Sequence, residues 1–166
     1  LSAQPQIIDD CRNIIGVCLG KVEATTAQIE KVYEVKVAAA LKSTETYTYS
    51  VETRGNVSAD LNEFIVQSGQ TLADQRGWTQ ADIGFSRVET GGNFILVLAE
   101  ASQMPTFSGG CDEFYSCRVG KYVIINQDRW LSGTPTWSGS LRDYRHMVVN
   151  HEVGHWLGHN HRNCPS

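Results

Sequence analysis

The chain has 166 residues, of which 41 % are hydrophobic and 19 % charged, a composition that suits one globular domain and argues against wholesale disorder. Fourteen Lys and Arg against eighteen Asp and Glu give a net charge of −4 with no basic run, so the charge pattern does not support a nucleic-acid or anionic-membrane partner. Every apolar stretch is far shorter than the roughly 18 residues that a membrane span needs. We therefore expect one mildly acidic, monomeric domain without a membrane span.

The two ends of the chain affect its interpretation. It begins at Leu1 rather than Met and ends at Ser166, close behind its most specific motif. We therefore expect a processed form or a fragment of a longer protein, so that the missing targeting signal says nothing about location. Residues 1–45 are expected to form an N-terminal extension of unknown role with an extra strand at 30–40, and residues 46–166 to form the functional domain.

The first expected elements of that domain are a strand and a helix. Residues 46–53 alternate β-branched and aromatic residues, as a strand does. Ser58 resembles a helix N-cap, with Asp60 in the first turn, and apolar residues at helical spacing follow. Gln67 is expected to point away from the apolar face, and Gly77 to end the helix. The apolar positions are Leu61, Phe64, Ile65 and Leu72.

Three further strands are expected, at residues 83–88, 93–99 and 122–126. The second is almost continuously apolar, which indicates burial on both faces, as in a parallel or mixed sheet covered by helices. The 89–92 link is short enough for a hairpin, so periodicity leaves hairpin and parallel pairing open. Residues 127–139 are expected to be a connection. This order of strands and helices predicts an α/β layered domain.

The cysteines favour an oxidising compartment. None of the five stands in a C-x-x-C pair of the kind that zinc fingers use. Cys111 and Cys117 bracket a short polar and aromatic segment, as a disulfide-closed loop would. Cys11 and Cys18 could close a second loop, which would leave Cys164 over. We favour a secreted or extracytoplasmic location over the alternative, five reduced and buried thiols in a cytoplasmic protein.

The last expected helix carries the most specific motif. Ser140 and Asp143 fit a capping box, which predicts that the helix starts there. Within it, H-E-x-x-H places His151 and His155 about 40° apart in direction and about 6 Å apart in height, so both imidazoles can reach one ion. Catalytic zinc takes three protein ligands and keeps one open position. Glu152 projects from the same turn without having to coordinate, so it can hold the metal-bound water.

The third ligand follows by elimination. No acidic residue comes after Glu152, so His159 and His161 are the candidates. In a continued helix, His151 and His159 would lie about 12 Å apart along the axis, too far to share a zinc ion. Gly158 can adopt the left-handed conformation that ends a helix, which would return His161 to the metal. The predicted Zn²⁺ ligands are therefore His151, His155 and His161.

This ligand set predicts an endopeptidase that acts on a protein or peptide substrate. Zinc lowers the pKa of its bound water toward about 7 and polarises the scissile carbonyl. Glu152 would accept the proton of the attacking water and deliver it to the leaving amine. The alternative is a non-catalytic binding module that zinc stabilises, or an inactive fragment. A structural site has no use for a carboxylate beside His151, so Glu152 favours the peptidase.

These residues carry a resemblance to a known family. The pattern His151-Glu152-x-x-His155-x-x-Gly158-x-x-His161 matches the signature of the metzincin zinc peptidases in every specified position, and residues 85–97 resemble the second and third strands of that clan. Over residues 46–164, the chain is more closely similar to an uncharacterised family of predicted secreted bacterial proteins. The features that carry this similarity are Tyr49–Gly55, Arg76–Trp78, Ile125–Trp130, Tyr144–Arg145 and Val149–Glu152.

The resemblance implies a zincin fold, with a twisted, mostly parallel sheet, a backing helix and a zinc-binding helix below it. In that fold the 89–92 link joins two parallel strands, and an edge strand, expected within residues 101–119, takes part in substrate selection. Metzincins also place a methionine in a turn after the third histidine, whereas Met104 and Met147 both precede the motif. The implied catalytic domain, residues 46–166, would therefore end after the third zinc ligand, without the lower subdomain.

Overall fold

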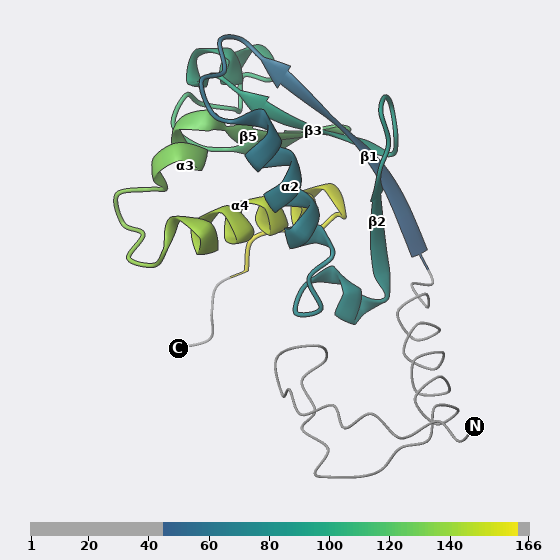
Figure 1. Ribbon diagram of the computed structural model, residues 1–166. Helices are drawn as coiled ribbons and strands as arrows, with labels where there is room; N and C mark the ends of the chain where they lie inside the picture. Colours follow the sequence, from purple (N-terminus) through teal and green to yellow (C-terminus); the bar gives the residue numbers. More distant parts are fainter. Residues whose placement is uncertain (1–44, 163–166) are drawn as a thin grey trace, which may run out of the picture. The chain divides into compact units, whose positions relative to one another are not determined.

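The structure, a computed structural model, describes residues 45–162 (Figure 1). The strand expected at 30–40 lies outside the described residues, as do Cys11, Cys18 and Cys164. In the described range, no helix combines the length and the apolar character that crossing a membrane requires.

The described strands form one mixed sheet, and they are β1 (Glu45–Arg54), β2 (Ile83–Arg87), β3 (Phe94–Ala99), β4 (Cys117–Val119) and β5 (Tyr122–Asn126). Their order in the sheet is β2-β1-β3-β5-β4. The pairs β1–β2, β1–β3 and β3–β5 are parallel, whereas β4 runs antiparallel to β5 at one edge. The prediction of a mixed, mostly parallel sheet is therefore confirmed.

The segment between β2 and β3 crosses over β1. β2 pairs with the first half of β1 and β3 with the second half, and the two registers meet at Tyr49. At the crossing, the Asn93 amide donates to the Thr48 carbonyl (2.7 Å), and Asn93 Oδ1 accepts from the Thr48 amide (2.8 Å). Gly92 has a φ of +93°, and a Cβ there would lie 2.8 Å from the Thr48 oxygen, so the crossing requires glycine. The link joins two parallel strands, and the hairpin alternative is wrong.

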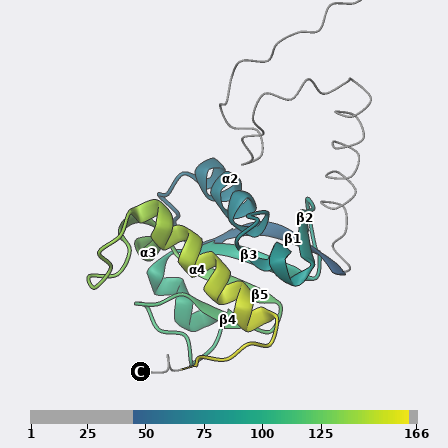
Figure 2. The ribbon, with the colours of Figure 1, turned by 90° about the horizontal axis from the view of Figure 1, so that it is seen from below.

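Helices cover one face of the sheet, and a short 3-10 segment covers the other (Figures 1 and 2). The helices are α2 (Leu61–Leu72), α3 (Gln127–Ser132) and α4 (Leu141–Trp156), and the 3-10 segments are η1 (Trp78–Ala81) and η2 (Ala101–Thr106). Alternate side chains of β3 point to opposite faces of the sheet. Phe94 packs with the helices, whereas Ile95 packs with Met104 of η2. The predicted burial of this strand on both faces is confirmed.

The first helix differs from the prediction at both ends. Asp60, rather than Ser58, is the N-cap, and its carboxylate accepts two amide hydrogen bonds of 2.8 and 3.0 Å. A carboxylate satisfies the free amides and also complements the helix dipole, whereas the Ser58 amide is bound to Gln127 (2.9 Å). The helix ends at Leu72, and Gly77 instead precedes η1.

Gln67 faces the core rather than solvent, which corrects the prediction. It is only 4 % exposed, and its Nε2 donates to the Arg142 carbonyl (3.2 Å). Its Oε1 accepts from the buried Arg145 (3.1 Å). The same guanidinium donates to Glu63 (2.6 Å) and to the Trp130 carbonyl (2.8 Å). A polar side chain is stable at this position because α4 brings it a complete set of partners, which the sequence pattern of α2 does not reveal.

Part of the connection expected at 127–139 is helical. Asn126 caps α3 by accepting from the Asp128 amide (2.9 Å). Trp130 of this helix is fully buried, and its ring meets that of Phe64 edge to face at 4.8 Å. Six residues are too few to display an amphipathic period, so this helix had no pattern by which it could be predicted.

Candidate metal centre

The helix that carries the motif begins and ends where the sequence predicts. Ser140 is its N-cap, and Ser140 Oγ accepts from the Asp143 amide (3.1 Å). At the other end, Gly158 has a φ of +94°. The His159 amide donates to the Gly154 carbonyl (2.9 Å), the long-range bond of a Schellman turn. The chain thus reverses directly behind the last helical turn.

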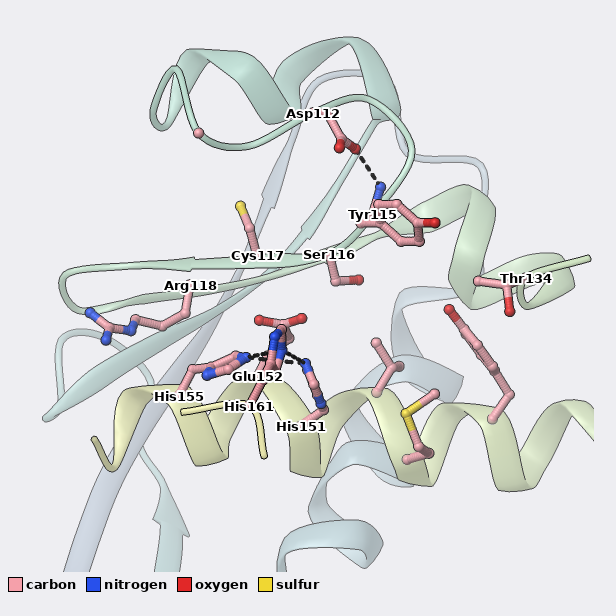
Figure 3. A pocket seen from close by; sticks show the side chains of 14 residues that line it. Asp112, Tyr115, Ser116, Cys117, Arg118, Thr134, His151, Glu152, His155 and His161 are labelled. Atoms are coloured by element: carbon pink, nitrogen blue, oxygen red, sulfur yellow. Dashed lines mark hydrogen bonds between the residues drawn. The ribbon is translucent and has the colours of Figure 1, made fainter. Parts of the chain in front are cut away.

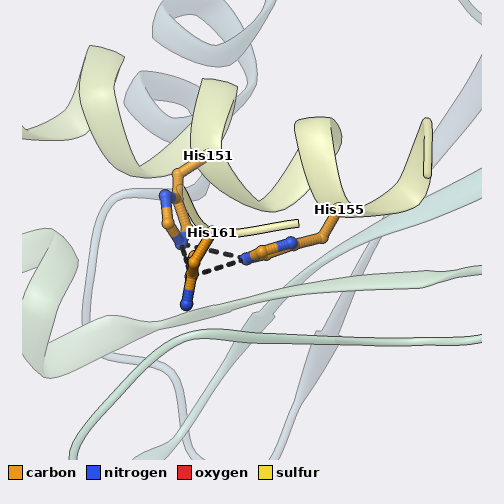
Figure 4. A group of neighbouring side chains, drawn as sticks. All are labelled: His151, His155 and His161. Atoms are coloured by element: carbon orange, nitrogen blue, oxygen red, sulfur yellow. Dashed lines mark hydrogen bonds between the residues drawn. The ribbon is translucent and has the colours of Figure 1, made fainter. Parts of the chain in front are cut away.

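This reversal brings three imidazoles together (Figure 4). The Nε2 atoms of His151 and His155 lie 3.1 Å apart, and the Nε2 atom of His161 lies 3.0 Å from each of them. His159 is not in this group. The structure therefore assembles the three histidines that the sequence analysis selected, two from adjacent helical turns and one from the segment after the turn.

The protonation of His155 shows how such a group suits a cation. Its Nδ1 lies 2.8 Å from the His159 main-chain oxygen, which can only accept, so in the neutral ring Nδ1 carries the proton and Nε2 presents a lone pair to the other rings. Partial burial, and then the neighbouring imidazoles, lower the pKa of His151, which favours the neutral form that binds metals. Neutral imidazoles whose lone pairs point toward one position can share a cation placed there, and zinc accepts such nitrogens at about 2.0–2.1 Å.

The ligand count matches a catalytic rather than a closed structural site. Within residues 45–162, no fourth histidine, cysteine or carboxylate joins the group of His151, His155 and His161. Structural zinc sites are usually closed by four protein ligands, whereas catalytic ones have three and leave one position for water or substrate. The three imidazoles thus fit Zn²⁺ with an open position.

Glu152 lies beside this group without belonging to it (Figure 3). It is 5 % exposed, and burial raises the pKa of its carboxyl to about 7, against the opposing charge of Arg118. No group in the described part of the chain donates a hydrogen bond to it. A buried carboxyl that titrates near neutrality and has no protein partner is suited to exchange protons with a substrate or a water molecule.

A cavity of about 680 Å³ opens onto Glu152 and the three histidines. In Figure 3, Arg118 lies on the side of His155, while Tyr115 and Thr134 lie on the opposite side. Helix α4 contributes an apolar floor at that end, formed by Tyr144, Met147 and Val148. The cavity therefore has a cationic end and an aromatic and aliphatic end.

A disulfide loop and the edge strand form the wall above the cavity. Cys111 and Cys117 are bonded, with Cα atoms 5.9 Å apart, so the predicted pair is confirmed. Asp112 and Ser116 of this loop line the cavity, and β4 follows directly. Because β4 pairs only with β5, its outer edge has no partner strand in the described range. The edge strand expected within residues 101–119 is therefore β4.

Other residues singled out in the sequence have different environments. The His159 ring stacks on Trp78, with centroids 5.6 Å apart. His146 is half-buried, and its Nδ1 lies 2.7 Å from Thr71 Oγ1. Tyr144 also lines the cavity. Residues 144, 148, 151 and 155 follow a helical stripe, and this spacing was the signal that could have found it.

Arg118 and Tyr115, which also line the cavity, had no such signal. Tyr115 comes from an irregular segment and Arg118 from a three-residue strand. In such segments, sequence spacing does not predict where a side chain points.

Comparison with known proteins connects the chain to one family. The family model described as "Protein of unknown function (DUF3152)" matches residues 20–166. The match therefore includes part of the region that the sequence analysis left without a counterpart. No curated protein and no solved structure matches the chain.

Proposed function

We propose that this chain, which belongs to the DUF3152 family, is a zinc-dependent endopeptidase of the metzincin type. The observation that carries the proposal is the juxtaposition of three mutually facing imidazole nitrogens with a buried carboxylate that is not one of the group. His151, His155 and His161 would hold Zn²⁺. Further support comes from the eleven-residue pattern and from a mostly parallel sheet that carries α2 and α4 on one face.

The chemistry divides between the ion and the protein. Bound zinc supplies a Lewis acid that makes water more acidic and polarises a carbonyl. Glu152 accepts the proton of the attacking water and passes it to the leaving amine, a role that suits a carboxyl with a pKa of about 7. The His159 carbonyl holds the Nδ1 proton of His155, which fixes the orientation of that ring.

A peptide substrate suits the surroundings of the centre. The free edge of β4 offers main-chain amides and carbonyls that an extended peptide can pair with, as a further strand of the sheet. The cavity next to β4 is large enough for side chains on both sides of a scissile bond. The Cys111–Cys117 disulfide supports a secreted or extracytoplasmic location, where such bonds persist.

Cleavage of an unfolded protein, with and without a chelator, tests the proposal. The zinc-loaded protein is expected to fragment reduced, alkylated casein. A chelator should stop the reaction. Added Zn²⁺ should restore it, because chelation removes only the ion and leaves the histidine ligands and the substrate cavity intact. Fragments are resolved by mass spectrometry. Tight zinc binding without any cleavage would instead support the non-catalytic binding module.

Arg118 is expected to select substrates that carry a carboxylate near the cleaved bond. Among the described residues that line the cavity, Arg118 is the one lysine or arginine. Within the described range it forms no ion pair. The Asp112 carboxylate, which also lines the cavity, already accepts from the amides of Phe114 and Tyr115 (2.8 Å each). For two peptides that differ only by Asp or Lys, kcat/KM should favour Asp by roughly fivefold to tenfold, and Arg118→Glu should reverse the order. Equal rates for both peptides would contradict this role.

A further inference from the structure

A tryptophan distant in sequence lies against the turn that delivers the third histidine. Trp78 belongs to η1, between α2 and β2. Its ring stacks on that of His159, with centroids 5.6 Å apart and an interplanar angle of 12°. The indole Nε1 is buried and, among the described residues, has no hydrogen-bond partner. The indole is therefore held by ring contacts and packing rather than by a polar bond.

The same indole packs on the last turns of α4. A Cβ built on Gly154 would lie 3.3 Å from Trp78 Cζ2 and 3.4 Å from Cη2, so any side chain at this position would press on the ring. Gly154 lies inside the H-E-x-x-H motif, where glycine weakens a helix by about 1 kcal/mol relative to alanine. Its presence is explained by the space that Trp78 occupies.

His159 connects this packing to the metal ligands. Its amide donates to the Gly154 carbonyl (2.9 Å), and its carbonyl accepts from His155 Nδ1 (2.8 Å). Its ring is the part that Trp78 holds. His161 follows two residues later, in an exposed segment without regular structure. The position of that ligand thus depends on how firmly His159 is fixed.

The position of Trp78 is itself set by the end of α2. The Asp74 carbonyl accepts from the Gly77 amide (3.0 Å) and from Thr79 Oγ1 (2.8 Å), on either side of the tryptophan. These bonds attach η1 to the turn that directly follows the backing helix. Trp78 is therefore placed by a part of the fold that does not depend on the segment after α4.

We infer that Trp78 is a positioning residue of the metal centre, which clamps His159 and so holds both the His155 ring and the His161 arm ready for the ion. A ligand on a loose arm loses conformational freedom when it binds, and a preorganised arm avoids that cost. Hydrogen-bond partners of metal-ligating histidines, the position that the His159 carbonyl holds, typically contribute 10-fold to 100-fold in affinity. The inference rests on the zinc centre of the proposed function, but not on peptide hydrolysis.

Zinc affinity of the folded protein, measured by competition with a chromophoric chelator, tests the clamp. Trp78→Ala is expected to weaken Zn²⁺ binding by about 10-fold to 100-fold, whereas Trp78→Phe, which keeps a ring for stacking, should stay within about threefold of wild type. Trp137→Ala is the matched control, because Trp137 is also half-buried but packs on Tyr144 at the other end of α4. Its affinity should equal that of wild type.

His159→Ala provides a second route that leaves Trp78 in place. It removes the ring but keeps the carbonyl, so it should weaken zinc binding by about the same factor as Trp78→Ala. The double variant should bind zinc no more weakly than either single variant, because both substitutions remove the same contact, the stacking of Trp78 on His159. The visible spectrum of the Co²⁺ protein should change in the same variants. If Trp78→Ala does not fold, the His159→Ala affinity decides the question alone.

Two results have distinct meanings. Wild-type affinity in Trp78→Ala or in His159→Ala overturns the clamp while leaving the zinc centre in place. If the wild-type protein itself does not bind zinc, the proposed function fails first. Losses that add in the double variant would show that Trp78 acts elsewhere in the fold, and would also overturn the inference.

Discussion

Glu152→Gln is expected to abolish peptide cleavage while leaving zinc affinity within about threefold of wild type. Glutamine keeps the shape of the side chain but cannot accept the proton of the attacking water. General acid–base catalysis contributes about 10²-fold to 10⁴-fold, so kcat should fall by that factor. Cleavage of a fluorogenic peptide and zinc competition, on the same samples, measure the two effects.

Two further measurements make this result specific. Glu89→Gln is the control, since Glu89 is exposed and lies in the crossing segment, away from the cavity, so that variant should keep full activity. The melting temperature of Glu152→Gln should not fall, because the change removes a buried charge that has no protein partner. Full cleavage by the Glu152 variant would refute its role as general base. Loss of zinc together with loss of cleavage would assign Glu152 to the ligand set.

His161→Ala is expected to weaken zinc binding by 10²-fold to 10³-fold or more. The variant leaves two ligands, and each ligand of a zinc site supplies several kcal/mol of the binding free energy, on the order of 10 kcal/mol in total. Competition with a chelator and native mass spectrometry measure affinity and stoichiometry. Cleavage should be lost in parallel.

His146→Ala is the matched control for this variant. His146 lies on α4 like two of the proposed ligands, but its imidazole contacts Thr71 and lies outside the group. Its removal should leave zinc affinity unchanged. If His161→Ala bound zinc as tightly as wild type, the centre would not be built as we propose, whatever the control showed.

The features that sequence reasoning predicted well depend on short-range geometry. The start of α4 at Ser140 follows from one side chain that caps nearby amides. The approach of His151 to His155 follows from the helical repeat, and the return of His161 follows from the left-handed conformation that Gly158 adopts. β3 and β5 were found because strands buried on both faces are continuously apolar.

Most of what the sequence did not predict concerns side chains or segments whose partners are distant in the sequence. Gln67 was expected outside because its helix gives no hint that Arg145 lies opposite. The 89–92 link left two pairings open because periodicity along a strand carries no information about its neighbour. α3 was too short to show a period.

The candidate site divides in the same way. Its ligands and its carboxylate all lie within the eleven consecutive positions from His151 to His161, so local backbone geometry was enough to identify them. The cavity, the unpartnered edge of β4, the cation of Arg118 and the stacking of Trp78 on His159 arise only when separate elements pack together. Contacts of this kind depend on how the sheet and helices fill space around one another, and no repeat or spacing along the chain encodes that arrangement.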